Sequence, residues 1–140
     1  MILNKNISLK NIVIEKVEHE HISNKIKQMD IGVFFLNPSF SKLASNPTKM
    51  GEFLASGIPC ITNSGIGDVD FLINQNKCGF LLNDINDKID EKFVLNSLNI
   101  IFNKITHNNC RYVAENYLSL DKAVDKINFI YDKITNKNIL

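Results

Sequence analysis

Arginine, tryptophan and any surplus of one charge are nearly missing from this sequence. Arg111 is the only arginine among the 140 residues, and there is no tryptophan. Bidentate guanidinium contacts are therefore scarce, so a bound anion would have to be held mainly by lysine and by backbone N–H groups. Lysine and arginine together number 16 against 15 acidic residues, a formal net charge of +1. This balance argues against nucleic-acid binding, which usually requires a basic surplus on one face.

Long apolar segments are also missing. No run approaches the roughly 18–20 apolar residues that span a bilayer, and residues 1–10 lack the apolar segment of a signal peptide. We expect a soluble, cytoplasmic chain with at most peripheral membrane contact. Cys60, Cys78 and Cys110 are odd in number and show no C-x-x-C spacing. Their pattern favours reduced core residues over a disulfide, a zinc site or a nucleophile.

The apolar pattern predicts a single α/β domain over residues 1–140. Short β-branched runs alternate with longer helical periods, which is typical of a parallel, Rossmann-like sheet flanked by helices. We expect about four strands, at residues 11–17, 31–36, 58–62 and 79–82. The run at 31–36 is almost continuously apolar, which indicates a strand buried on both faces.

Helices are expected between the strands and at the C-terminal end. Their predicted ranges are residues 22–29, 47–56, 68–74 and a helical region from about residue 87, with a break at Asn108–Asn109 and a last helix near 123–134. The second helix is the best marked, because Asn46 is a good N-cap, Pro47 suits the first position and Gly57 follows as a stop. His107 falls in a polar turn between helices and is assigned no role.

Two loops follow predicted strands at the carboxyl edge of the sheet, where open parallel sheets bind ligands. The first, residues 38–49, leads into the helix that begins at Pro47. The free N–H groups of Thr48, Lys49 and Met50 suit an anion together with the helix dipole, and Lys49 adds a positive charge. The alternative is an ordinary capped helix with a solvated lysine.

Glu52 lies on the same helix edge as this candidate anion site. It follows Thr48 by four residues and Lys49 by three, while Met50, Phe53 and Leu54 face the core. A carboxylate beside an anion site suits a ligand that also presents hydroxyl groups, such as a ribose diol. The alternative is a surface glutamate paired with Lys49, which would contribute little.

The second loop, residues 63–68, carries Gly65 and Gly67. Glycines allow a backbone to approach a ligand closely or to turn with positive φ, although the loop matches neither the dinucleotide fingerprint nor the P-loop. Asp68 and Asp70 form a D-x-D pair, which could hold a divalent metal. Acids in a first helical turn are favoured by the dipole in any case, so we expect no metal.

Other chemistry-bearing residues show no pattern. His19 and His21 would need a third ligand to bind a metal, so a solvated loop is the better interpretation. No Ser/His/Asp or Cys/His spacing supports covalent hydrolase chemistry, and no residue is assigned a catalytic role.

One segment resembles a known family. Residues 46–61 read N-P-T-K-M-G-E-F-L-A-S-G-I-P-C-I and are followed by G-I-G-D at 65–68. This pattern resembles the C-terminal, donor-binding domain of GT-B glycosyltransferases, most closely the glycogen-synthase-like group 1. Flanking segments are similar to the family as well, so that the likeness covers roughly residues 12–134 (Met29–Val33, Cys78–Leu82, Arg111–Leu118 and Ile130–Tyr131).

The resemblance implies that Glu52 contacts the ribose of a nucleotide-sugar and that the Thr48–Lys49 turn faces its diphosphate or its sugar. The donor-binding residues would be Asn46, Pro47, Thr48, Lys49, Glu52, Gly65 and Gly67. The implied activity is transfer of a sugar to a glycan or lipid-linked acceptor, in cell-surface polysaccharide synthesis. The nucleotide-sugar is then a substrate, and no cofactor is expected.

Two departures from the family shape the expectation. Ala44 stands where the family often carries a glutamate that contacts the donor sugar. The basic pair that neutralises the diphosphate and the acceptor-binding N-terminal domain are expected upstream of Met1. We therefore expect the isolated chain to be inactive and to have that N-terminal domain or subunit as a partner. The alternative is a non-catalytic α/β nucleotide-binding or interaction module with a degenerate site.

Overall fold

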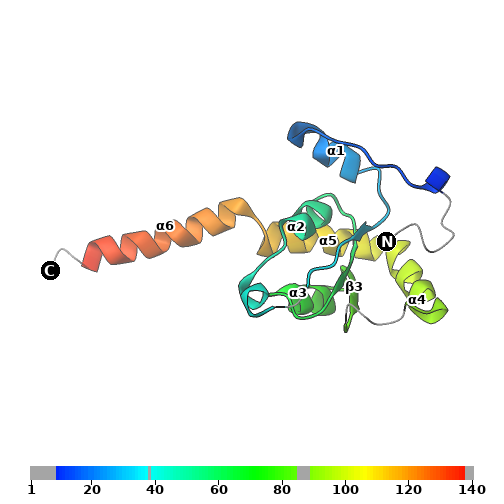
Figure 1. Cartoon of the computed structure of the whole chain (residues 1–140). Coiled ribbons are helices and arrows are strands. Elements are labelled where there is room, and N and C mark those ends of the chain that lie inside the picture. The colour runs from blue at the N-terminus through cyan, green and yellow to red at the C-terminus, as the bar shows by residue number, and fades with distance from the viewer. Residues whose placement is uncertain (1–8, 38, 85–88, 138–140) are drawn as a thin grey trace.

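Three parallel strands form an open sheet in the order β1-β2-β3 (Figure 1). The computed structural model describes residues 9–37, 39–84 and 89–137. The strands are β1 (Gly32–Val33), β2 (Cys60–Asn63) and β3 (Gly79–Leu82). The helices are α1 (Ile22–Ile26), α2 (Thr48–Ala55), α3 (Val69–Asn76), α4 (Glu91–Ile101), α5 (Lys104–Tyr117) and α6 (Leu120–Lys137), with short 3-10 helices at Leu9–Asn11, His19–His21 and Phe40–Ala44. The α/β class and the parallel sheet are confirmed.

The strand expected at residues 11–17 is wrong, so the described sheet is one strand smaller than predicted. A 3-10 helix ends at Asn11, and the residues after it pair with no strand. Val13 and Ile14 are 81% and 90% exposed, on a segment that arches away from the sheet (Figure 1). β-branched residues favour a strand where neighbouring strands pack against them, and residues 12–17 pair with no described strand.

The sheet is covered unevenly. Phe34 and Leu36 pack into a core formed with α2, α3 and α5. On the opposite face, Val33 is 54% and Phe35 37% exposed, which corrects the expectation of a strand buried on both faces. Within the described residues, α4 covers that face beside β3, where the rings of Phe80 and Phe93 meet edge to face at 4.6 Å.

Helix α2 begins and ends close to the predicted positions. Pro47, rather than Asn46, is the N-cap, since its carbonyl accepts the first helical bond from Met50 N at 3.0 Å. At the other end Gly57 adopts φ +77°, as expected of a stop residue. Gly57 N donates to Leu54 O and Ile58 N to Phe53 O, at 3.0 and 2.9 Å. These two hydrogen bonds form a Schellman motif, which requires the left-handed conformation that glycine adopts at little cost.

The break expected at Asn108–Asn109 is wrong, because both residues lie inside α5. The chain turns earlier, at Phe102–Asn103, where the Asn103 side chain accepts from Ile105 N at 2.9 Å and caps α5. An asparagine favours a helix start only where its side chain meets a free backbone N–H, and inside α5 those groups are already bonded.

Helix α4 also begins at a side-chain cap. Asp90 is its N-cap, and the carboxylate accepts from Phe93 N at 2.7 Å. A carboxylate at this position satisfies a free N–H group and is favoured by the helix dipole. Residue 87, the predicted start of the helical region, lies outside the described residues.

The Asn63 side chain continues the pairing of β1 with β2. Its amide oxygen accepts from Leu36 N at 2.9 Å, and its amide nitrogen donates to Leu36 O at 2.9 Å and to Ser64 O at 3.1 Å. Asn63 is fully buried, so these bonds satisfy polar groups that water does not reach. They hold the end of the chain after β1 against the end of β2.

The three cysteines are free and buried, as the sequence predicts. They lie together in the core between the sheet and α5, where Cys110 Sγ donates to Cys78 O at 3.4 Å. Burial raises the pKa of Cys78 to about 11 and that of Cys110 to about 12, and it also raises the pKa of Cys60. These thiols are therefore neutral apolar groups of the core near neutral pH.

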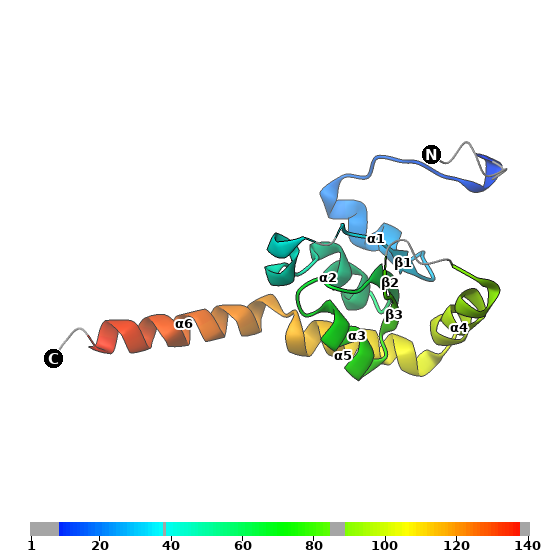
Figure 2. The same ribbon diagram turned by 60° about the horizontal axis from the view of Figure 1, so that its bottom comes forward.

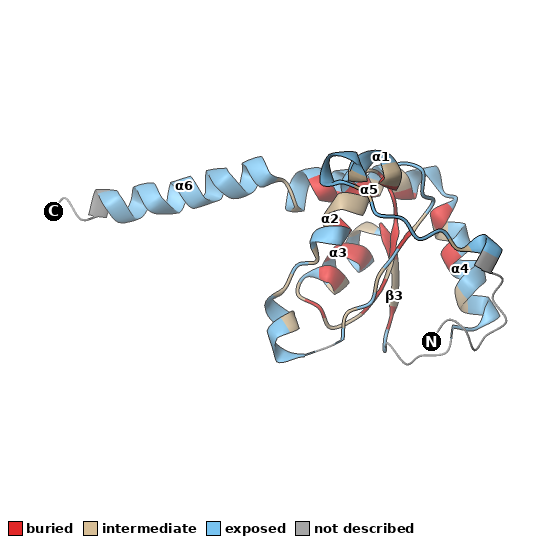
Figure 3. Ribbon diagram, turned by 45° about the horizontal axis from the view of Figure 1, so that its top comes forward, coloured by how far each residue is buried: buried red, intermediate tan, exposed pale blue. Residues whose placement is uncertain are grey.

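Helix α6 projects away from the rest of the chain (Figures 1 and 2). Colouring by burial shows it exposed along its described length (Figure 3). Across the residues that the structure describes, no helix has both the length and the apolar character needed to cross a membrane.

Asn63→Ala tests the side-chain bridge between β1 and β2. We expect the free energy of unfolding to fall by about 2–3 kcal/mol, because both backbone groups of Leu36 lose their partners in a partly buried position. Urea denaturation measures this change. The control is Asn96→Ala on the exposed surface of α4, and an equal loss in both variants would contradict the role of the bridge.

Thiol reactivity tests the burial of the cysteines. At pH 8 the native protein is expected to leave a thiol-specific reagent unconsumed, whereas in denaturant all three cysteines react. Because the pKa of each thiol is higher in the folded state, stability is retained below about pH 9 and falls as the pH rises above it. A fast-reacting native thiol at pH 8 would contradict the described core.

Candidate functional site

The two predicted loops contact each other at the carboxyl edge of the sheet. Gly67 N donates to Lys42 O at 3.0 Å, which ties the loop after β2 to the loop after β1. Gly67 adopts φ +42°, and a Cβ atom there would lie 1.9 Å from Ser45 O. Glycine is therefore required at this position by the close approach of two backbone segments, rather than by the approach of a ligand.

Asp70 closes the second loop from within. Its Oδ2 atom accepts from Ser64 Oγ at 2.5 Å and from Gly65 N at 3.2 Å. Asp68 occupies the N-cap of α3, but its exposed side chain makes no capping bond. The Asp70 side chain therefore stabilises the second loop through these two hydrogen bonds. In the described part of the chain, no cluster of three or more histidine, cysteine, aspartate or glutamate residues is placed to hold a metal.

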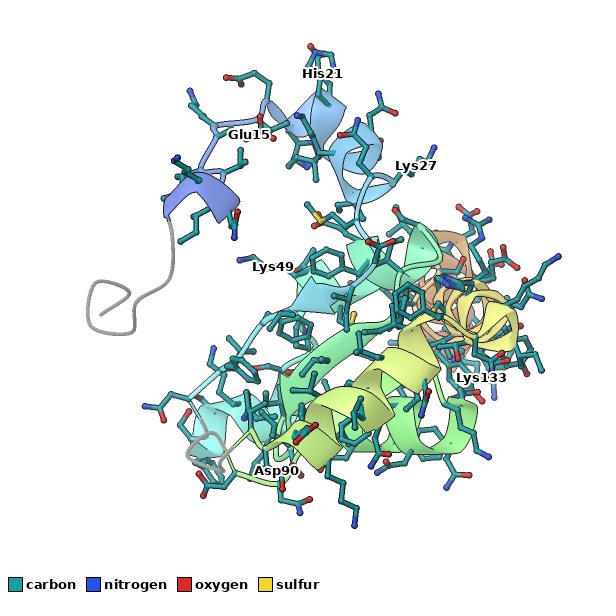
Figure 4. All side chains as sticks on the ribbon, turned by 90° about the vertical axis from the view of Figure 1, so that its right-hand side faces the viewer. Glu15, His21, Lys27, Lys49, Asp90 and Lys133 are labelled. Atoms are coloured by element: carbon teal, nitrogen blue, oxygen red, sulfur yellow. The ribbon has the colours of Figure 1, made fainter. Side chains whose placement is uncertain are left out.

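The first turn of α2 offers two backbone donors instead of the three expected. Met50 N already donates to Pro47 O, so that expectation is wrong for Met50. Over residues 9–37, 39–84 and 89–137, no hydrogen bond engages the backbone N–H of Thr48 or Lys49. Lys49 is exposed and extends beneath the N-terminal segment that carries Glu15 and His21 (Figure 4). The start of the predicted loop, at residue 38, lies outside the described residues.

Glu52 is half-buried on the edge of α2, while Met50 and Leu54 are fully buried, as the helical spacing predicts. The pairing with Lys49 considered above does not form: of the ion pairs between described residues, none includes Glu52 or Lys49. The Glu52 carboxylate therefore keeps its acceptor capacity for solvent or a ligand.

Glu52 lies between two cavities. One, of about 360 Å³, contains much of the predicted site and borders the end of α5 at Leu118 (Asn46, Pro47, Thr48, Gly51, Glu52, Ala55 and Leu118). The other, of about 470 Å³, lies between α1 and α2 and has a mixed lining of apolar, basic and other polar residues (His19, Ile22, Ser23, Ile26, Lys27, Glu52, Ala55, Ser56 and Arg111). Glu52 can therefore face a ligand that extends from one cavity into the other.

The predicted site residues are only partly brought together. Asn46, Pro47, Thr48 and Glu52 line one cavity, whereas Lys49, Gly65 and Gly67 are not among its lining residues. Gly67 holds the two loops together. Gly65 adopts φ +84°, and a Cβ atom built there meets open space.

Sequence reasoning missed the residues of α5 that hold α2. His107 Nδ1 lies 2.7 Å from Gly57 O, and Arg111 Nη1 donates to Ala55 O. Both carbonyls belong to the C-terminal end of α2, where basic side chains can bond the last carbonyl groups. His107 thus lies inside α5 and contacts the end of α2, so the prediction that it falls in a turn between helices is wrong. The signal available in the sequence was the spacing of four residues between His107 and Arg111.

The basic residues of the α1–α2 cavity were also missed. Lys27 and His19 come from the segment before β1, where the sequence pattern suggested no role for Lys27 and a solvated loop for the histidines. Figure 4 shows Lys27 and Lys49 extending in different directions, so the two lysines do not form one clamp. Lys27 therefore lines the α1–α2 cavity beside Glu52. Lys49 lies in the first turn of α2.

A further cavity lies away from Glu52. It measures about 620 Å³ between α3, β3, α4 and α5 and includes Asn74, Lys77, Asn83 and Asn99 in its lining. Ser64 connects it to the second loop, but none of the predicted donor-binding residues lines it.

Comparison with protein-family models, with curated proteins and with solved structures found no match to this chain. The assignment of a function therefore depends on the motif residues and on their geometry.

Gly67→Ala tests the contact between the two loops. We expect the free energy of unfolding to fall by about 2 kcal/mol or more, because the new methyl group would collide with a backbone carbonyl. Thermal and urea unfolding measure the loss. Gly65→Ala is the matched control, since it also places alanine at positive φ but meets no atom and should cost only about 1–2 kcal/mol. Equal losses would contradict a specific loop contact.

Proposed function

We propose that this chain is the donor-binding portion of a GT-B glycosyltransferase of the glycogen-synthase-like group. It binds a nucleotide-sugar, and the complete enzyme transfers the sugar to a glycan or lipid-linked acceptor in cell-surface polysaccharide synthesis. The acceptor is bound by an N-terminal domain or subunit. The observation that carries this proposal is the half-buried Glu52 carboxylate, which pairs with no described cation and lies on the edge of α2 between two cavities.

The arrangement around Glu52 suits the parts of a nucleotide-sugar. The carboxylate accepts from both ribose hydroxyls. The α1–α2 cavity, with Ile22 and Ile26 in its lining, receives the base. The diphosphate lies toward the N–H groups of Thr48 and Lys49, which no described residue engages, and there the helix dipole and the lysine charge stabilise an anion.

The contribution of the chain to catalysis is electrostatic. Charge develops on the diphosphate as the sugar leaves, and prearranged donors and cations lower the energy of that state. Lys49 is the cation on the α2 side of Glu52, and Arg111 is engaged with Ala55 O and Glu115. We therefore expect the isolated chain to bind nucleotide-sugars more weakly than micromolar and to leave them unhydrolysed.

Glu52→Ala tests the ribose contact. In ligand-observed NMR titrations with UDP- and GDP-sugars, the wild-type chain should show weak binding, and the variant should bind about tenfold or more weakly because charge-assisted hydrogen bonds are lost. The control is Glu91→Ala, an exposed glutamate at the start of α4, which should leave binding unchanged.

Three outcomes would contradict the proposal in different ways. Unchanged affinity in Glu52→Ala would favour the non-catalytic interaction module, with Ala44 marking a degenerate site. Micromolar binding or donor hydrolysis by the isolated chain would show that the chain is sufficient by itself. Binding that disappears with EDTA would favour a metal held at Asp68 and Asp70.

A further inference from the structure

The outer edge of β3 carries unpaired backbone groups. In the parallel pairing of β2 with β3, Ser64 N donates to Leu82 O at 2.8 Å. A parallel strand turns the backbone groups of alternate residues to opposite neighbours, so those of Gly79, Leu81 and Asn83 point away from β2. Among the described residues, no hydrogen bond engages these outward groups. The free edge therefore offers N–H and C=O groups at every second residue, and at its start Gly79 is buried.

The cavity of about 620 Å³ runs along this edge. Lys77 and Gly79 line it at the amino end of β3, and Asn83 and Ser64 line it at the carboxyl end. Helix α3 packs on one face of the sheet beside β3 and α4 on the other (Figure 2). An extended chain rises about 3.3 Å per residue, so the length of β3 corresponds to a segment of about four to six residues.

Amide side chains surround the edge. Those of Asn74, Asn83 and Asn99 line the cavity and make no hydrogen bond with another described residue. An asparagine amide both donates and accepts, as a peptide group does. The three side chains can therefore bond to the backbone of a chain segment that lies along β3.

Thr106 is a buried polar side chain of the same lining. It is 5% exposed, and its hydroxyl makes no hydrogen bond within the part of the chain that the structure describes. The buried hydroxyl of Ser97 differs, since it donates to Phe93 O, four residues earlier in α4, at 2.8 Å. Thr106 lies in the first turn of α5, and the residue four positions before it precedes the helix. Because buried polar groups are nearly always hydrogen-bonded, the free hydroxyl indicates a polar partner in the cavity.

We propose that the free edge of β3 is a peptide-binding site, to which an extended segment of a partner protein adds as a further strand. The outward groups of Gly79, Leu81 and Asn83 repeat every second residue, which matches the donors and acceptors of a β-strand. A hydroxyl-rich small molecule would bond to the amide side chains but has no such repeat. A second copy of β3 is less favoured, because it would bring its own α3 and α4 against the helices that border the groove.

Lys77 gives the site a charge preference. Of the described residues that line the cavity, only Lys77 is charged, and it forms no ion pair with a described residue. An acidic side chain or a terminal carboxylate of the bound segment would accept from it at the amino end of β3. The site therefore favours a β-branched segment with a carboxylate at that end.

Amide hydrogen exchange followed by NMR tests the free edge. In the chain alone, the N–H groups of Gly79 and Leu81 should exchange faster than those of Phe80 and Leu82, which face β2. We then expect a set of blocked hexapeptides, in which β-branched and polar residues alternate and one residue is a glutamate, to slow the exchange at Gly79 and Leu81. Slow exchange there without peptide, or binding by none of the hexapeptides, would overturn the proposal.

N-methylation of a bound hexapeptide distinguishes an added strand from other ligands. Methyl groups on the alternate residues that face β3 remove donors to the strand, so binding should weaken about tenfold or more. The same groups on the intervening residues should have a much smaller effect. Equal effects on both sets would overturn the proposal. Glucose that shifts the amide resonances of Gly79 and Leu81 would instead identify a hydroxyl-rich ligand and overturn it as well.

Lys77→Asn tests the charge preference. Lys77 adopts φ +52°, a conformation that asparagine tolerates, so the variant removes the charge without adding backbone strain. We expect about fivefold weaker binding of the glutamate-containing hexapeptide and unchanged binding of the same peptide with glutamine. Lys92→Gln, an exposed lysine of α4 outside the cavity, is the matched control and should change neither. Equal losses for both peptides in Lys77→Asn would overturn the charge preference. These readouts do not depend on nucleotide-sugar binding.

Discussion

The bridge made by the Asn63 side chain is the interaction on which the arrangement of the site depends. Strand β1 is only two residues long, so backbone pairing alone ends well before the loop that follows it. By bonding to both backbone groups of Leu36, Asn63 carries the alignment of the two strands further toward their carboxyl ends. Both loops therefore leave the sheet side by side, and the Gly67–Lys42 bond can form between them. The start of α2 is positioned by the same constraint.

The C-terminal end of α2 is held by a different set of contacts. His107 and Arg111, one turn apart on α5, reach the carbonyls of Gly57 and Ala55. The single arginine of the chain is thus engaged by backbone and by Glu115. Any anion bound beside α2 must be neutralised by lysine, by backbone N–H groups or by residues from another domain. This distribution of cations accounts for the weak donor binding that we propose for the chain alone.

The exposed apolar surfaces divide into two kinds. Val33 and Phe35 lie on the sheet face that α4 covers only beside β3, and Val13 and Ile14 lie on the N-terminal segment away from the sheet. These are short groups of apolar residues. The exposed apolar residues of α6 extend over a longer segment and recur at helical spacing, which is the pattern of a helix that packs against other helices.

Local sequence was sufficient for the α/β class, for the positions of β1 to β3 along the chain, for the approximate limits of α2 and α3 and for the buried cysteines, because the hydrophobic period and the stop at Gly57 act over a few residues. It also placed Glu52 on the free edge of α2. It could not decide whether residues 11–17 form a strand, since pairing requires a neighbour that no local pattern supplies.

The contacts that shape the site were beyond the reach of local patterns. The Asn63 bridge and the bonds of His107 and Arg111 to α2 join residues 27 to 56 positions apart. The second cavity beside Glu52 likewise combines α1, α2 and α5. Only the tertiary structure decided these features, because such contacts depend on how separate elements pack and leave no periodic signal in the sequence.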